Sequence, residues 1–398
     1  MPTQTRLRYP ILFSAALAML ACNLPTTSPL ELTPVPVAEA TLDLRQPEIT
    51  PVEVIPTPTD DFIPYPENVN PLTGLPVSDI SLLERRPVSI KVTNYPRTSR
   101  PQWGLSLADI VYEYYHNNDL PRFHAIFYTY NAPLVGPIRS ARLFDHYLIS
   151  SYKSNFASGS ADSRIREFLL EQSYGDRLIF LLSGLCPPRP VCRFEPDTHN
   201  FLVADTEAIG DYLSARGVDN SRQNLNGMLF ADQPRQGGMA VTRLYVRYSY
   251  GAYAYWQYDE NSGRYYRYQD TQEDVGGRGE AYALMTDRLT AAPVMADNVI
   301  ILAIPHFHTV YTPPANGNPA IEIVDMIFEG SGQAYALRDG RAYNLNWVRA
   351  ADDAMITLRN GDGSLYPFKP GVTWFQVVGN PSSLTTTGDI WRLVFALK

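Results

Sequence analysis

Apolar positions follow two different spacings along the chain, and the change between them lies near residue 236. Before it, short runs with a period of two, which are typical of strands, alternate with segments that read as helices. The predicted strands are residues 87–92, 108–114, 122–128 and 178–182, with a short one near Phe156, and the predicted helices are residues 138–152, 163–172 and 206–216. This alternation predicts a mixed α/β domain over residues 67–235.

Beyond Gln236-Gly237-Gly238 the pattern is almost wholly that of strands. The predicted strands are residues 241–250, 252–258, 263–268, 298–304, 320–328, 333–337, 355–358 and 372–378. Turn-forming pairs such as Asp339-Gly340 separate them. We expect a β-rich domain over residues 236–398, folded as a sandwich or a partly open barrel, and hence an α+β protein.

The N-terminus has the pattern of a bacterial lipoprotein signal. Arg6 and Arg8 precede an apolar stretch, and Met19-Leu20-Ala21-Cys22 has the form of a lipobox. The apolar run of residues 9–21 is too short to cross a bilayer, which takes about 20 residues. We expect residues 1–21 to be a signal peptide and Cys22 to accept diacylglycerol, which anchors the chain to the extracytoplasmic side of the cell membrane. The alternative is an ordinary cleaved signal with an incidental cysteine.

Residues 22–66 have the composition of a spacer. Ten prolines and seven acidic residues occur between residues 25 and 66, against one base, Arg45. Proline stiffness and like-charge repulsion favour an extended, disordered tether.

The other two cysteines, Cys186 and Cys192, bracket a loop with three prolines. In an oxidising compartment this spacing predicts a local structural disulfide. A redox pair or a metal site would need closer spacing or more ligands.

Composition narrows the function further. The chain has 398 residues, 45% hydrophobic and 19% charged, which is enough to build about two folded domains. Its formal net charge of −8 repels phosphate backbones, so we expect no nucleic-acid partner.

Seven short segments resemble the YerB-like lipoprotein family, which is catalogued as a domain of unknown function with N- and C-terminal parts. They are NPLTG (70–74), RPQ and GLS (100–106), ADIVYE (108–113), GPIRSAR (136–142), NVI (298–300), GSG (330–332) and PGVTW (370–374). The segment ASGS (157–160) departs from the family, which tends to have paired glycines before the serine. The resemblance implies an extracytoplasmic lipoprotein with an α/β part and a β-rich part, and it implies no reaction.

The most suggestive polar group lies in the fourth of these segments. If residues 138–152 are helical, Arg139 and Arg142 share a helix face near the positive end of the helix dipole and can bind a carboxylate or a phosphate. The alternative is that both arginines pair internally with Asp109 and Glu113. Asn94 and Arg100 would border the same crevice if the strand ends converge on one sheet edge. The candidate ligand-binding residues are therefore Asn94, Arg100, Asp109, Glu113, Arg139 and Arg142.

Catalytic signals are weak. Asp109 and Glu113 are a candidate acid and base pair for glycan hydrolysis, although four residues along a strand span about 13 Å. His306 and His308 share a strand face but lack further ligands for zinc. Neither a nucleophile elbow nor a phosphate-loop or dinucleotide pattern occurs, so we expect no cofactor, no metal and no assigned catalytic residue.

Aromatic residues crowd one predicted hairpin, which contains nine tyrosines and Trp256. The tyrosines are residues 245, 248, 250, 253, 255, 258, 265, 266 and 268. Such rings stack on sugars, but tyrosines also stabilise strands through cross-strand pairs.

Together these features predict a lipid-anchored envelope protein that binds an anionic or cell-wall glycan ligand, or another envelope protein. The alternatives are a hydrolase that acts on a cell-wall polymer and a receptor for a transported solute.

Overall fold

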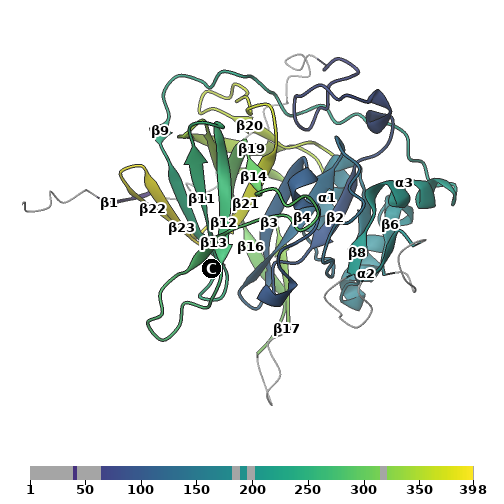
Figure 1. The fold of residues 1–398 in the computed structure, drawn as a ribbon, viewed down its shortest axis with the longest axis horizontal. Helices are drawn as coiled ribbons and strands as arrows, with labels where there is room; N and C mark the ends of the chain where they lie inside the picture. The colour runs from purple at the N-terminus through teal and green to yellow at the C-terminus, as the bar shows by residue number, and fades with distance from the viewer. Residues whose placement is uncertain (1–38, 43–63, 182–188, 195–201, 314–320, 398) are drawn as a thin grey trace, which may run out of the picture. The chain divides into compact units, whose positions relative to one another are not determined.

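Two β-sheets contain most of the strands in the computed structural model, which describes residues 39–42, 64–181, 189–194, 202–313 and 321–397. The larger sheet has eleven strands and the smaller sheet has eight (Figure 1). The described residues also form three α-helices, all before residue 215. The predicted fold class, a mixed α/β segment followed by a β-rich segment, is confirmed. No helix in the described part of the chain is both long and apolar enough to cross a bilayer.

The larger sheet is built from both segments. Its spatial order is β20-β19-β18-β15-β21-β3-β4-β2-β5-β6, with β9 paired to β19. From the first segment come β2 (Val88–Val92), β3 (Ile110–Asn117), β4 (Leu120–Phe127), β5 (Asn155–Ala157) and β6 (Leu178–Ile179). From the second come β9 (Met239–Ala240), β15 (Asn298–Ile304), β18 (Gly330–Arg338), β19 (Arg341–Arg349), β20 (Thr357–Arg359) and β21 (Thr373–Gly379). Strand β21 is parallel to both of its neighbours, β15 and β3. The predicted boundary near residue 236 therefore lies between segments that share one hydrogen-bonded sheet.

The smaller sheet packs against one face of the larger sheet. Its order is β1 (Glu39–Leu42), β22 (Ser383–Thr387), β23 (Ile390–Val394), β10 (Arg243–Arg247), β11 (Tyr253–Asp259), β12 (Arg264–Asp270) and β13 (Tyr282–Leu284), with β14 (Met295–Ala296) on β12. Alternate residues of these strands are buried, as the period of two requires. Between the sheets the rings of Trp256 and Trp374 lie 5.2 Å apart.

Strand β1 lies within the predicted tether. Residues Glu39–Leu42 pair antiparallel with β22 at the edge of the smaller sheet. An edge strand exposes unpaired N–H and C=O groups, and a short extended segment can satisfy them whatever its side chains are. These four residues therefore differ from the disordered spacer that the composition predicts.

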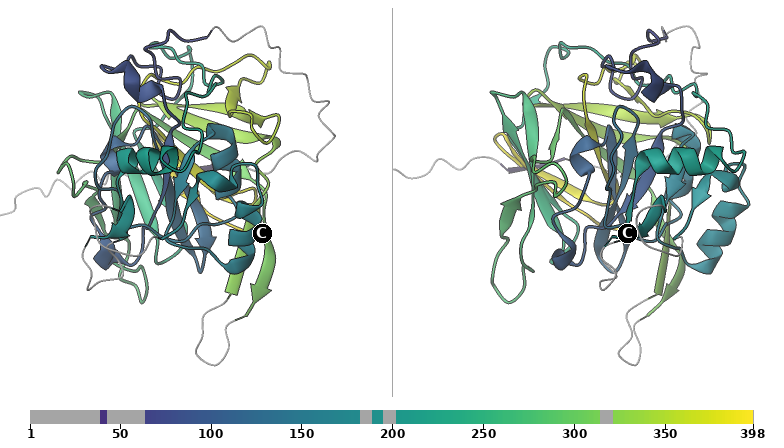
Figure 2. Two further views of the ribbon diagram at one scale, coloured as in Figure 1. Left: turned by 90° about the vertical axis from the view of Figure 1, so that its right-hand side faces the viewer. Right: turned by 45° about the vertical axis from the view of Figure 1, so that its right-hand side comes forward.

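The α-helices lie on the other face of the larger sheet (Figures 1 and 2). They are α1 (Asp145–Tyr152), α2 (Ser163–Leu170) and α3 (Thr206–Ser214). The side chains of Asp162 and Asp205 cap the first turns of α2 and α3 by accepting backbone N–H bonds. Shorter 3-10 turns occur at η1 (Ile80–Leu83), η2 (Arg97–Ser99), η3 (Leu105–Leu107) and η4 (Gly175–Arg177).

The prediction of a helix over residues 138–152 is wrong in its first half. Helix α1 begins at Asp145, residues 143–144 form a turn, and Ile138 lies in an isolated β-bridge with Val92. The backbone N–H of Arg139 donates to the carbonyl oxygen of Lys91 on β2, and that of Ala141 donates to Ser160. Because neighbouring segments accept these N–H groups, this part of the chain is held beside β2 and does not form a helix.

Two hairpins complete the described structure. Strands β7 (Val191–Arg193) and β8 (Leu202–Ala204) form one, and β16 (His306–Thr312) and β17 (Ile321–Met326) form the other. The second hairpin continues from β15 and projects beyond the neighbouring strands (Figures 1 and 2).

Candidate functional site

The six candidate ligand-binding residues occupy separate environments. Asp109 lies just before β3, and Glu113 lies on that strand, facing the smaller sheet. Asn94 and Arg100 lie in the segment that follows β2. Arg139 and Arg142 lie in the extended segment before α1. The structure therefore does not bring the six together in one site.

Asp109 is a buried structural acceptor. Its Oδ2 accepts hydrogen bonds from the backbone N–H groups of Tyr128 (2.5 Å) and Thr129 (2.8 Å). Burial raises the pKa of Asp109 to about 6, although these two hydrogen bonds oppose the shift. Asp109 thus fixes the turn that follows β4.

Glu113 lies between the two sheets, and both oxygens of its carboxylate accept hydrogen bonds. It accepts hydrogen bonds from Arg267 Nη2 (2.9 Å), Trp374 Nε1 (3.2 Å) and Gln376 Nε2 (2.9 Å). The Arg267 side chain is completely buried. The alternative in which Asp109 and Glu113 pair with Arg139 and Arg142 is therefore wrong, because both carboxylates have other partners.

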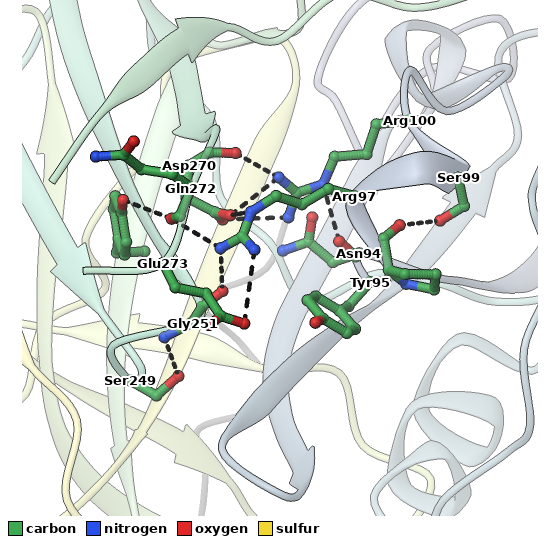
Figure 3. A network of polar contacts seen from close by, with 12 residues as sticks. Asn94, Tyr95, Arg97, Ser99, Arg100, Ser249, Gly251, Asp270, Gln272 and Glu273 are labelled. Atoms are coloured by element: carbon green, nitrogen blue, oxygen red, sulfur yellow. Dashed lines mark hydrogen bonds and ion pairs between the residues drawn. The ribbon is translucent and has the colours of Figure 1, made fainter. Parts of the chain in front are cut away.

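Asn94 and Arg100 belong to a network that joins the larger sheet to β12, shown in Figure 3. The carboxylate of Asp270 accepts from Arg97 Nε (2.5 Å) and Arg100 Nη2 (3.1 Å). Arg100 Nε also donates to the carbonyl oxygen of Asn94 at 2.9 Å. Arg97 Nη2 donates to Gly251 and Gln272, both at 2.8 Å. These contacts give Arg100 a structural role at the junction of the sheets.

Arg139 and Arg142 lie beside a third arginine, Arg122 on β4. We call these three residues the arginine cluster. Arg122 Nη1 donates to the carbonyl oxygen of Ser140 at 2.9 Å, and Arg142 Nη1 donates to the same oxygen at 3.4 Å. Arg142 Nη1 also donates to Ala141 at 2.8 Å, and Arg139 Nη1 donates to Ile138 at 3.2 Å. The guanidinium groups thus gather around one short stretch of extended backbone.

Burial weakens the charged form of each arginine. It lowers the pKa of Arg139 and Arg142, and it lowers that of Arg122 well below its ordinary value. The positive charges of Arg142 and Arg139 add to the effect on Arg122. Concentrated, partly desolvated positive charge is the electrostatic condition for binding an anion.

A buried polar layer, formed by Lys91, Tyr114, His124 and Asp145, supports the cluster. Asp145 Oδ1 contacts Lys91 Nζ (3.3 Å), His124 Nδ1 (2.8 Å) and Tyr114 OH (2.5 Å). Its Oδ2 accepts from the backbone N–H of Arg142 at 2.7 Å. This last contact fixes the arginine segment to the first turn of α1.

The protonation states within this layer follow from burial and pairing. Burial opposes ionisation of Asp145, but Lys91 and the hydrogen bonds from His124 and Tyr114 lower its pKa. Burial lowers the pKa of Lys91 to about 7 against the attraction of Asp145. Burial also lowers the pKa of His124, so this histidine is neutral at physiological pH.

His116 is a further buried group beside the cluster. It lies on β3 two positions beyond Tyr114, where the pairing of β3 with β4 shifts register. Burial, followed by the charges of Arg122, Arg142 and Lys91, lowers its pKa well below the ordinary value. Its Nδ1 has no hydrogen-bond partner in the described structure.

The hydrophobic pattern does not single out six residues of this site, which are Lys91, Tyr114, His116, Arg122, His124 and Asp145. The available signal was the charge within predicted strands. Lys91 interrupts the apolar strand 87–92, and Arg122 and His124 alternate within strand 122–128. Charged residues are almost never fully buried unless they are paired, so such positions indicate a buried polar site.

The tyrosine hairpin is explained by cross-strand packing. The rings of Tyr255 and Tyr268 are parallel, with an interplanar angle of 6° and centroids 4.4 Å apart. Tyr245 packs against Tyr255 at 5.3 Å, and Arg243 lies 5.4 Å from the Tyr255 ring. Because the neighbours cover these ring faces, the arrangement favours strand stabilisation over sugar stacking.

No group of three potential metal ligands occurs among the described residues. His306 Nδ1 contacts the carbonyl oxygen of Ile304 at 2.7 Å, and His308 lies 3.9 Å from Glu322.

Cys192 is buried on β7, whereas Cys22 and Cys186 lie outside the described residues. Lipidation and the Cys186–Cys192 disulfide therefore stay predictions.

The fold and this site define a two-sheet α/β protein with a partly buried arginine cluster beside its larger sheet. Comparison with known families gives two matches. Residues 72–220 match the family described as "Protein of unknown function (DUF3048) N-terminal domain", and residues 244–375 match its C-terminal domain. The chain belongs to this family, which confirms the resemblance found in the sequence.

A curated relative and a solved structure agree with this assignment. The chain is 27% identical over 321 residues to "Putative lipoprotein YerB" of Bacillus subtilis (strain 168), a match that covers 77% of this chain and 85% of the relative. It is also similar to the crystal structure of the YerB protein from Bacillus subtilis. That structure has a TM-score of 0.63 and 25% identity, and the match covers 80% of this chain and 99% of the other.

Proposed function

We propose that this chain is a lipid-anchored extracytoplasmic protein that binds an anionic ligand of the cell envelope through the arginine cluster. The ligand is an acidic cell-wall glycan or an acidic surface of another envelope protein. The observation that carries the proposal is the bonding of Arg122 and Arg142. All the hydrogen bonds found for their guanidinium groups within the described structure run to main-chain carbonyl oxygens.

Electrostatics supports this proposal. Carbonyl oxygens satisfy N–H donors but do not neutralise charge, so two adjacent guanidinium groups repel each other. The two carboxylates that attract Arg142, Asp145 and Asp162, already have partners. Asp145 contacts Lys91, and Asp162 accepts two hydrogen bonds from Arg164, both at 2.9 Å. An incoming anion would relieve the repulsion, and the planar guanidinium fork suits carboxylate and phosphate oxygens.

Support for the location comes from the N-terminus and from the relative. Cys22 ends a lipobox after an apolar stretch, and the curated relative carries the word lipoprotein in its name. Two acyl chains would hold the protein stably at a membrane. This position would place the arginine cluster among the acidic polymers of the envelope.

The hydrolase alternative has lost its proposed participants. Asp109 and Glu113 are only 3% and 2% exposed, and both are engaged by other protein groups. No other observation favours a particular reaction, so we argue binding alone.

The test is a sedimentation assay with peptidoglycan and with soluble wall fragments. The protein is the full chain carrying Cys22→Ser, which removes the acyl acceptor. We expect saturable binding without product release, and a loss of at least tenfold in affinity in Arg122→Gln and in Arg142→Gln. Arg341→Gln is the matched control, because Arg341 is an exposed arginine on β19 whose Nη1 donates to the carbonyl oxygens of Gly237 and Gly238.

Two results would contradict the proposal. One is equal binding by the wild type and both cluster variants, with circular dichroism showing that the variants are folded. The other is steady product release from a wall component that is lost in Asp109→Asn or Glu113→Gln.

A further inference from the structure

The charges around the arginine cluster do not balance. Among the carboxylates, Asp145 attracts both Arg122 and Arg142, and Asp162 also attracts Arg142. Asp145 is paired with Lys91 at 3.3 Å, and Asp162 is paired with Arg164 at 2.9 Å. Within the described residues, neither Arg122 nor Arg142 makes an ion pair with a carboxylate, so two positive charges are left without an ion-pair partner.

These two charges converge on one point. The Nη1 atoms of Arg122 and Arg142 lie 2.9 and 3.4 Å from the same oxygen, the carbonyl of Ser140. Two guanidinium groups that share one acceptor can also share one small anion with several oxygens. A phosphate group offers three terminal oxygens, whereas a carboxylate offers two.

His116 supplies a third, independent indication. His116 is only 6% exposed, and its Nδ1 has no hydrogen-bond partner in the described structure. A buried polar atom without a partner is costly, and a ligand bound beside Arg122 and Arg142 would satisfy it. In the tautomer that carries its proton on Nδ1, the neutral ring donates a hydrogen bond from that atom without adding charge.

From this juxtaposition we infer that the ligand group is a doubly charged phosphate monoester, held by Arg122 and Arg142 with His116 as a third donor. The inference rests on the proposed anion site and narrows its ligand class. A phosphate dianion matches the two remaining charges, whereas a carboxylate would leave one of them unbalanced. The same chemistry occurs in sugar phosphates and in lipid headgroups.

Calorimetric titration of the full chain carrying Cys22→Ser tests the inference. The probes are glucose 6-phosphate, inorganic phosphate and acetate at equal ionic strength. We expect both phosphates to bind at least tenfold more tightly than acetate. We also expect at least tenfold weaker phosphate binding in Arg122→Gln and Arg142→Gln, threefold or more weaker binding in His116→Leu, and a change below twofold in Arg341→Gln.

Affinities measured over a range of pH separate the effect of the ligand's charge from the effect of its shape. The second proton of a phosphate monoester leaves near pH 6, so affinity for glucose 6-phosphate should rise about tenfold between pH 5 and pH 7. Sulfate is doubly charged throughout and serves as the reference. It corrects for the other titratable groups that face the cluster, which are Lys91, Tyr114, His116, His124, Asp145 and Asp162.

The source of the phosphate is resolved with vesicles. Phosphatidylcholine vesicles with and without phosphatidic acid are compared with glucose 6-phosphate. Stronger binding to phosphatidic acid assigns the group to a lipid, stronger binding to glucose 6-phosphate assigns it to a sugar, and both outcomes support the inference. Acetate that binds as tightly as phosphate overturns the inference and leaves the anion site intact. Failure of every anion to bind overturns both proposals.

Discussion

The ion pair between Glu113 and Arg267 offers the sharpest test of how the two sheets are held together. In Glu113→Gln the side chain keeps its size and loses its charge. Arg267 is then a buried cation without a carboxylate. Its Nε and Nη1 already have no hydrogen-bond partner in the described structure, and its Nη2 bonds Glu113. The rings of Trp374 and Trp256, at 4.8 and 5.3 Å, are left as its main electrostatic support.

The expected magnitude follows from the burial of the pair. Removing one partner of a buried ion pair costs about 3–5 kcal/mol, because the other charge stays desolvated. A folded domain has a total free energy of unfolding of about 5–15 kcal/mol, so the loss is a large part of it. Glu113→Gln should therefore lower the midpoint of urea unfolding strongly.

The assay is equilibrium unfolding in urea, followed in parallel by circular dichroism and by tryptophan fluorescence. Asp219→Asn is the control, because Asp219 pairs with Arg86 at 2.6 Å but is 60% exposed, and surface pairs contribute about 0–1 kcal/mol. The double variant Glu113→Leu with Arg267→Met should recover much of the lost stability, because no buried charge remains. A loss below about 1 kcal/mol in Glu113→Gln would refute the reasoning.

Three further predictions address other parts of the chain. Because the pKa of folded Asp109 is raised to about 6, its contribution to stability is present below pH 4 and is lost as the pH rises through 6. Urea unfolding at pH 4 to 7 should therefore show the wild type losing about 2 kcal/mol relative to Asp109→Asn, and a constant difference would contradict the raised pKa. Cys22→Ser should move the protein from the detergent phase to the aqueous phase in a partition assay, and continued partition into detergent would argue against lipidation. Cys186 and Cys192 should resist alkylation until a reductant is added, as read by mass spectrometry, whereas labelling without reduction would rule out the disulfide.

Local pattern predicted many elements well. Strand β15 (Asn298–Ile304) has the bounds expected from its continuous apolar run, and α2 and α3 begin at the predicted residues. Strand β19 (Arg341–Arg349) was missed, because Asn344 and Asn346 interrupt its apolar positions and asparagine is depleted in strands. Its pairing with β18 along nine positions supplies the stability that the pattern does not indicate.

The site was only partly accessible from the sequence. Arg139 and Arg142 do lie together, although on extended backbone rather than on a helix, because β2 and the loop after β5 accept their segment's N–H groups. The partner of Glu113 is Arg267, 154 positions away, and no local spacing indicates such a contact. For the remaining residues the available signal was a charged side chain within a predicted strand. Interpreting that signal required the order of the strands in the sheet.

The position of β21 has a consequence for how the chain reaches its folded state. This strand lies in the middle of the larger sheet, and its Trp374 contacts Glu113, which is 261 positions earlier. A nascent chain emerging from the ribosome therefore keeps an edge of β3 open until almost all of the polypeptide has been synthesised. Such high contact order slows folding and exposes unpaired strands. On the location outside the cytoplasm that we propose, slow closure would keep the polypeptide unfolded during translocation and would give chaperones a defined edge to shield.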